Sequence, residues 1–209
     1  FAEELKYDAA TDKVDSITIK SDGARETLEC DAVVMALGSS GMKSVMNASP
    51  DLATRCPALA RAASLPAVDV VAARIWLDTT VPTDTPVGVF AKFPALRGAG
   101  GTFFMLDQLQ KDHQDELWAG QNAGERGSVL ACDFYNAGAI APLSDAEIVR
   151  ILTRDLLPEA YPAFRDAKVR DSHVKRYPRA GSWFSPGSFK NRPPLQTSLS
   201  NVVCAGDWV

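Results

Sequence analysis

The segment Asn201-Val-Val-Cys-Ala-Gly-Asp-Trp-Val209 decides the fold of this chain. Its apolar run at 202–204 is typical of a short buried strand, and a turn of small residues with one carboxylate follows it. In parallel sheets such strand ends meet nucleotide-type ligands, because glycine lets the backbone approach and aspartate accepts hydrogen bonds from sugar hydroxyls. We therefore expect a nucleotide-type ligand at Gly206 and Asp207.

Composition limits the class of protein. The 209 residues are 46% hydrophobic and 23% charged, which indicates a folded globular chain. A net charge of −4 without a basic cluster argues against nucleic acid as a partner. No apolar run approaches the roughly 20 residues that span a bilayer, which leaves peripheral membrane contact open. The chain begins at Phe1 rather than Met, so we expect a piece of a larger protein.

The cysteines and histidines carry no recognisable motif. Because the cysteines are widely spaced and form no CxxC or Cys/His cluster, we expect no metal site and reduced thiols. The two histidines, His113 and His173, lie far apart in the sequence without motif context. No GxSxG elbow accompanies them, so a Ser–His–Asp triad is not predicted.

Both ends of the chain have the pattern of β structure. Alternating apolar residues predict strands at 5–7 and 14–19, and a turn at 21–23 leads into a strand at 26–30. The apolar run from Asp31 to Leu37, ending at Gly38, predicts a strand buried on both faces.

The middle of the chain is mixed. Helices are predicted from Met42 and over 49–62, and Ser144-Asp-Ala-Glu147 predicts a capped helix ending near Leu157, before Pro158. Further strands are predicted at 68–77, 87–93, 102–106, 128–134 and 169–177. Gly98-Ala-Gly-Gly101 looks superficially like a phosphate loop, but a surface hairpin fits its context better. This organisation predicts an insertion that leaves one domain near Gly38 and returns near Leu199.

The order of these segments resembles the C-terminal half of the FAD-dependent amine oxidase and carotenoid (phytoene) desaturase superfamily. Phe184-Ser-Pro-Gly-Ser-Phe189, Arg192-Pro-Pro194, Thr197 and 201–209 carry the resemblance most sharply. It implies an α/β fold in which an α+β substrate domain is inserted in a Rossmann-like FAD-binding domain, of which this chain is a piece. The implied domains are 1–40 and 186–209 for FAD binding and 41–185 for substrate binding.

The resemblance also implies site residues. Gly206 and Asp207 would approach the ribityl–pyrophosphate region of FAD, Ala205 and Trp208 would make adjacent contacts, and Gly38 would pass beneath the flavin. The alternatives are an ordinary strand-end turn for Gly206 and Asp207, core packing for Trp208 and a plain interdomain connection for Gly38.

A second cluster of expected site residues precedes the final strand. Trp183, Phe184 and Gly187 would form an apolar wall of the substrate pocket that excludes water from the flavin. The alternative is a packed loop between domains.

The implied reaction is hydride abstraction from a C–C bond of an apolar polyene or lipid-like substrate. No catalytic side chain is assigned, because the flavin itself accepts the hydride. A quinone or dioxygen would be the electron acceptor, in a plastid or on the cytoplasmic side of a membrane. The alternatives are an amine oxidase acting on a C–N bond and a non-catalytic lipid- or carotenoid-binding homologue. The family's GxGxxG fingerprint is absent from these residues, so we expect the chain alone to hold FAD poorly.

Overall fold

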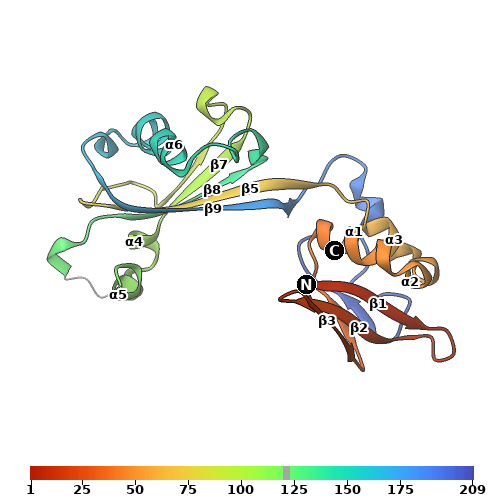
Figure 1. Ribbon diagram of the computed structural model, residues 1–209. Coiled ribbons are helices and arrows are strands. Elements are labelled where there is room, and N and C mark those ends of the chain that lie inside the picture. The colour runs from red at the N-terminus through yellow and green to blue at the C-terminus, as the bar shows by residue number, and fades with distance from the viewer. Residues whose placement is uncertain (120–122) are drawn as a thin grey trace. The chain divides into compact units, whose positions relative to one another are not determined.

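The computed structural model describes residues 1–119 and 123–209 (Figure 1). The chain divides into two compact units: unit 1 comprises Phe1–Ala67 and Arg179–Val209, and unit 2 comprises Val68–Pro178. Each unit has its own hydrophobic core. This division differs from the predicted domain boundaries at 40 and 185, because the helices that follow Gly38 bury Met42, Leu52 and Leu59 in the core of unit 1.

Unit 1 begins with the expected antiparallel meander. Its three strands are β1 (Ala2–Asp8), β2 (Lys13–Ser21) and β3 (Ala24–Glu29), paired in that order. Leu5 and Val14 point into the core, whereas every residue of β3 is exposed. The predicted strands are confirmed, and the alternation of their side chains decides which face is buried.

A parallel strand pair forms the other sheet of unit 1. Strand β4 (Val33–Met35) pairs with β10 (Val202–Cys204), Val33 opposite Val202 and Met35 opposite Cys204. The prediction that this strand is buried on both faces is wrong, since the side chain of Val34 is 65% exposed. Successive side chains of a strand alternate, so Val33 and Met35 reach the core while Val34 faces away from it.

Three helices pack against these strands. They are α1 (Ser39–Ala48), α2 (Pro50–Arg55) and α3 (Pro57–Ala62). Proline opens both α2 and α3, where the missing N–H has no helical partner to lose. The hydroxyl of Ser49 accepts a hydrogen bond from the backbone of Leu5 at 2.9 Å and ties the start of α2 to β1. The predicted helical region is confirmed.

Unit 2 is built on a five-stranded sheet. Its order is β6 (Val87–Phe90), β7 (Gly100–Met105), β8 (Val129–Tyr135), β5 (Ala67–Leu77) and β9 (Val169–Ser182). A Cβ atom on Gly101 would lie 2.5 Å from the ring of Phe134, so glycine is needed for this strand to pack. The segment at 98–101 leads into β7 and belongs to a hairpin, as expected, and not to a phosphate loop.

Helices lie on both sides of this sheet (Figure 1). One side carries α6 (Asp145–Arg150), a π-helical stretch (Ile151–Leu156) and α7 (Leu157–Ala160); the other carries α4 (Leu106–Leu109) and α5 (Gln114–Leu117). The predicted cap is confirmed, because the Ser144 hydroxyl accepts from the backbone of Glu147 at 3.2 Å. Helical structure continues to Ala160 because Pro158 sits in the first turn of α7, where proline is tolerated.

Candidate functional site

The candidate site begins at the carboxyl edge of the β4–β10 pair. Past the last paired residues, the backbone N–H of Ala205 donates to the carbonyl of Met35 at 3.0 Å. The strands are parallel, so the two loops that follow them leave from the same edge. One loop leads through Gly38 into α1, and the other is the turn at 205–208. The carboxyl edge of parallel strands is where α/β sheets bind ligands.

The turn at 205–208 requires its glycine. Gly206 has a φ of +124°, and a Cβ atom there would lie 2.8 Å from Nε1 of Trp208. The indole of Trp208 is only 2% exposed and packs in the core of unit 1, whereas Asp207 is exposed. The turn therefore anchors itself with a buried ring and presents an open backbone and a free-standing carboxylate.

The second loop presents the start of α1. Gly38 is the N-cap residue with a φ of −66°, and the space where its Cβ would lie is open. Gly38 therefore does not adopt the left-handed backbone conformation that favours glycine. Ser39, which begins the helix, is buried, and no side chain caps the first backbone N–H groups of α1. Such a helix start favours acceptors and negative charge.

Both loops carry buried polar atoms without hydrogen-bond partners. Across the described residues six such side-chain atoms occur, and four of them are in unit 1: Ser39 Oγ, Ser40 Oγ, Arg192 Nε and Trp208 Nε1. Ser39 and Ser40 are the first residues of α1, which the first loop enters, Trp208 lies in the second loop, and Arg192 contacts the second loop. Buried polar groups nearly always have partners. Their grouping here fits a site that a polar ligand completes.

Arg192 joins the second loop to a preceding aromatic residue. Its Nη2 donates to the carbonyls of Asp207, at 3.2 Å, and of Val209. The centre of its guanidinium lies 4.9 Å from the ring centroid of Phe184. Arg192 belongs to a motif that carries the family resemblance, but the sequence predicted no role for its side chain. Its contacts depend on how the loop at 183–195 folds back.

The predicted apolar wall lies on that loop. Trp183 and Phe184 are about half exposed, at 48% and 57%, and the backbone of Trp183 donates to the carbonyl of Pro66 at 3.0 Å. Gly187 has a φ of +81°, which suits glycine, in the turn closed by Ser188 N–H and the Ser185 carbonyl. Of the three residues, Phe184 is linked to the 205–208 turn, through Arg192. Their role in a substrate pocket stays a prediction.

Unit 2 contains a cavity of about 480 Å³ on one face of its sheet. Its residues alternate with core residues along β5, β8 and β9: Ala72, Arg74, Trp76, Ala131, Asp133 and Tyr177 are among them. Ala72 lies opposite Asp133 and Arg74 opposite Ala131 across the β5–β8 pair. Partial burial raises the pKa of Asp133. Sequence reasoning missed this site, although the period-two pattern of these strands marks which side chains face away from the core.

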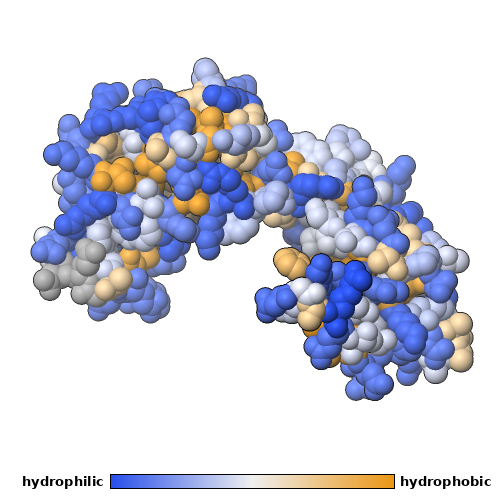
Figure 2. Space-filling model, viewed as in Figure 1, coloured by the Kyte–Doolittle hydropathy of each residue, from blue (hydrophilic) through white to orange (hydrophobic). Residues whose placement is uncertain are grey.

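Hydrophobic and hydrophilic residues are interspersed on the surface of both units. Figure 2 shows apolar residues in patches bordered by hydrophilic ones over the face of unit 2 that is in view.

Within residues 1–119 and 123–209, no helix has the length and apolarity needed to cross a membrane. The four cysteines are free thiols in this structure.

Comparisons with known proteins agree with these features. The sequence model described as flavin containing amine oxidoreductase matches residues 3–209. The carotenoid phi-ring synthase of Streptomyces griseus is 28% identical over 185 residues, which are 88% of this chain and 33% of that protein. The chain therefore spans about a third of this curated relative.

Solved structures share the fold. Cyclohexylamine oxidase from Brevibacterium oxydans IH-35A matches with a TM-score of 0.55 and 14% identity, over 99% of this chain and 42% of that one. An oxidoreductase from Methanosarcina mazei matches with a TM-score of 0.51 and 13% identity, over 100% of this chain and 43% of that one. The predicted mixed α/β fold, present as part of a longer one, is confirmed.

Proposed function

The chain belongs to the flavin containing amine oxidoreductase family, and on this premise we propose that it is part of a FAD-dependent oxidoreductase acting on an apolar polyene. The family confirms FAD as the predicted cofactor. The bound cofactor would supply the hydride acceptor. The residues of this chain would hold the cofactor, exclude water and position the substrate carbon.

The observation that carries the proposal is the set of unpartnered polar atoms at the carboxyl edge of β4 and β10. FAD offers phosphate oxygens and ribityl hydroxyls, which are the partners that two serine hydroxyls, an indole N–H and an arginine N–H lack. The uncapped start of α1 suits a phosphate group. Gly206 allows the backbone to approach, and Asp207 would accept hydrogen bonds from hydroxyls. Ala205, Trp208 and Gly38 would support these contacts.

In this proposal the two units have different roles. Unit 1, which contains the β4–β10 edge, would bind the cofactor, and unit 2 would present the open sheet face to the substrate. Trp183, Phe184 and Gly187 would contribute an apolar wall that keeps water from the reacting atoms.

Two observations support a polyene as substrate. The one curated relative described above is named for a carotenoid, which is a polyene. The cavity of unit 2 includes Ala72, Ala131, Trp76 and Tyr177, which offer apolar surface to a long hydrocarbon. Its charged members include Arg74 and Lys175 beside Asp133, so positive side chains outnumber the negative one. A site for an ammonium substrate would have the opposite balance.

Asp133 favours a second candidate, oxidation of an amine at its C–N bond. This carboxylate lies on the sheet face and could pair with an ammonium group of a substrate. Asp133 is partly buried, and this reduced contact with water raises the pKa of its carboxyl. Asp133→Asn separates the two candidates: it would raise the KM of an amine by tenfold or more, on the order of one lost charged hydrogen bond, and leave the KM of a polyene unchanged.

The electron acceptor and the setting are parts of the same proposal. A quinone would suit a protein that takes its substrate from a membrane, and dioxygen would suit one that acts in water. Phe189 and Leu195, in the segment that follows Trp183 in the sequence, are 81% and 64% exposed, which supports peripheral membrane contact in a plastid or on the cytoplasmic face of a membrane. Oxygen consumption during turnover, compared with reduction of an added quinone, distinguishes the acceptors.

The test is a visible absorption spectrum of the purified full-length protein, before and after denaturation. A flavoprotein shows bands near roughly 370 and 450 nm that belong to the oxidised cofactor. Anaerobic addition of a polyene whose conjugation is too short to absorb in the visible should then bleach the flavin band, whereas addition of primary amines should not. A protein that stays colourless after refolding with excess FAD would instead be a non-catalytic lipid- or carotenoid-binding homologue.

A further inference from the structure

We propose that Arg192 is a positioning residue for the cofactor: it fixes the turn at 205–208 and offers its buried Nε–H to bound FAD. This inference rests on the proposed function, because it assigns Arg192 a role at the same FAD site. No motif in the sequence gives the arginine this role.

The first argument is where the guanidinium donates. Nη2 of Arg192 donates to the carbonyl of Asp207 at 3.2 Å, directly before the buried Trp208. The side chain thereby fixes the direction of this carbonyl next to the ring that anchors the turn. Gly206 removes the usual restriction on the backbone at the start of this turn, so the contact with Arg192 adds to the buried Trp208 ring in holding the turn in one conformation.

The second argument is how the guanidinium itself is held. Gly187, at a φ of +81°, turns the chain, and a short 3-10 turn (Ser188–Asn191) follows it. The backbone N–H of Arg192 closes this turn on the carbonyl of Phe189 at 3.0 Å. The fold-back places the guanidinium over the Phe184 ring, at 4.9 Å from its centroid. Stacking on an aromatic face fixes the plane of the guanidinium, and this fixes the direction of each of its N–H groups.

The third argument is a buried donor without a partner. Nε of Arg192 is buried and has no hydrogen-bond partner. An N–H of a charged group that is buried without a partner is costly, and native proteins rarely keep one. It lies on the same guanidinium that holds the proposed cofactor-binding turn. An acceptor oxygen of FAD would complete its hydrogen bonding and bring a positive charge beside an anionic cofactor.

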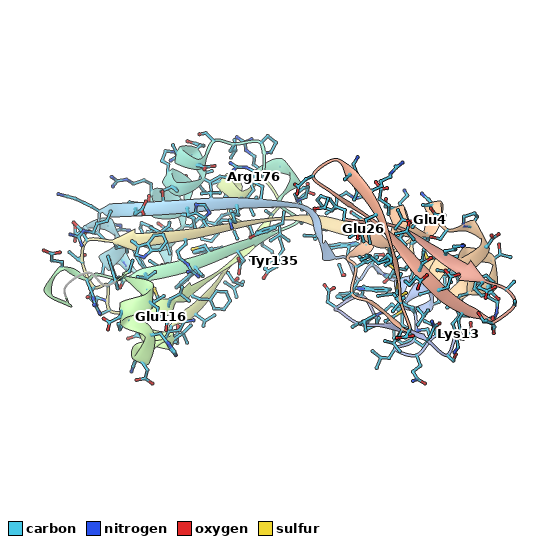
Figure 3. The ribbon with its side chains drawn as sticks, turned by 60° about the horizontal axis from the view of Figure 1, so that its bottom comes forward. Glu4, Lys13, Glu26, Glu116, Tyr135 and Arg176 are labelled. Carbon is cyan, nitrogen blue, oxygen red and sulfur yellow. The ribbon has the colours of Figure 1, made fainter. Side chains whose placement is uncertain are left out.

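The experiment compares four proteins, all full length: the parent, Arg192→Lys, Arg192→Gln and the control Arg176→Lys. Arg176, labelled in Figure 3, donates to the carbonyls of Ala141 and Leu143 at 2.7 and 2.6 Å in unit 2. It therefore donates to backbone carbonyls as Arg192 does, and it also pairs with Asp145, in the unit that does not carry the proposed FAD site. The readouts are the Kd of FAD by titration of the apoprotein, and the thermal midpoints of the apoprotein and the FAD-loaded protein.

The expected result is a selective loss of cofactor affinity. Arg192→Gln should raise the Kd of FAD by roughly tenfold or more, the size of a lost charge-assisted hydrogen bond. Arg192→Lys should raise it less, because lysine keeps the charge but lacks the fork. The rise in thermal midpoint on adding FAD should shrink in both variants, since ligand-induced stabilisation follows affinity. Arg176→Lys should lower both midpoints equally and leave the Kd unchanged.

Each other outcome overturns the inference. An unchanged Kd in Arg192→Gln, or an equal rise in Arg176→Lys, shows that Arg192 serves stability alone while the proposed function stands. A parent that binds no FAD removes the proposed function and this inference with it. If Arg192→Gln does not fold, Arg192→Lys and Phe184→Leu decide by the same Kd criterion, since the second keeps the guanidinium and removes only the ring beneath it.

Discussion

The side chain of Asn201 pairs with the backbone of Val14 in both directions. Its Nδ2 donates to the Val14 carbonyl at 2.7 Å, and its Oδ1 accepts from the Val14 N–H at 3.2 Å. The same Nδ2 donates to the carbonyl of Asp31 at 3.1 Å. One amide thus joins the meander to the segments that lead into β4 and β10, which holds the proposed cofactor edge against the rest of unit 1.

Replacing this amide should destabilise unit 1. Asn201→Ala removes three hydrogen bonds and leaves part-buried backbone groups without partners, so we expect a loss of about 2–3 kcal/mol in the free energy of unfolding. Urea denaturation of the purified protein measures it. Asn47→Ala, at an exposed position of α1, is the matched control and should change stability by less than about 0.5 kcal/mol. Equal effects of the two substitutions would contradict the assignment.

Gly206 should tolerate no side chain. Gly206→Ala forces a residue with a Cβ to a φ of +124° and brings that atom 2.8 Å from Trp208 Nε1. We expect a loss of about 2–3 kcal/mol in unfolding free energy, together with a lower flavin content. Gly98→Ala is the control for backbone strain alone, because Gly98 has a φ of +91° and open space around its Cβ position. It should cost about 1 kcal/mol, and a Gly206→Ala variant no worse than this would show that Trp208 simply moves aside.

Asp207 should affect cofactor binding and not folding. Its carboxylate is exposed, and its backbone carbonyl is the atom that Arg192 contacts. Asp207→Ala should therefore weaken FAD binding by about 1–3 kcal/mol, as for the loss of hydrogen bonds to a bound ligand. Titration of the apoprotein with FAD measures this, with Glu26→Ala on the exposed strand β3 as the control. A variant with the parent's affinity would remove Asp207 from the site.

The acid stability of the chain should depend on Asp12. Arg55 donates to this carboxylate at 2.6 Å and Tyr7 at 2.7 Å, and together they lower the pKa of Asp12 from 3.8 to about 2. Because its pKa is lower in the folded than in the unfolded chain, Asp12 stabilises the fold above pH 3.8, and this contribution is lost as the pH falls through about 2. Urea denaturation at several pH values should show a smaller loss below pH 4 in Asp12→Asn than in the parent. Parallel curves would exclude this role.

Local patterns in the sequence predicted most of the secondary structure. The alternation in β1 and β2, the capping box at Ser144 and the turn before β7 depend on neighbouring residues, so one sequence suffices to find them. The error at β4 had a physical cause: an apolar run has the same composition whether one face or both are covered. The exposure of Val34 depends on which elements cover its side of the strand, and the composition of the strand does not contain that information.

The candidate site, like the secondary structure, was predictable only where it depends on residues that are close in the sequence. Gly206 needs its conformation for reasons contained in a short segment, namely the turn and the indole two residues later. The contact of Arg192 with Phe184 and Asp207 arises from a fold-back around Gly187, which no local pattern specifies. The face of unit 2 that carries Asp133 required knowing which strands are neighbours.

The parallel pairing of β4 with β10 also constrains how the chain folds. Asn201 and Asp31 are 170 positions apart, and the whole of unit 2 lies between them in the sequence. Closing so long a loop is slow and entropically costly unless the intervening segment is already compact. The chain enters unit 2 through β5 and leaves it through β9, which are neighbours in one sheet. Unit 2 should therefore fold first, and its sheet should bring the two distant strands of unit 1 within reach of each other.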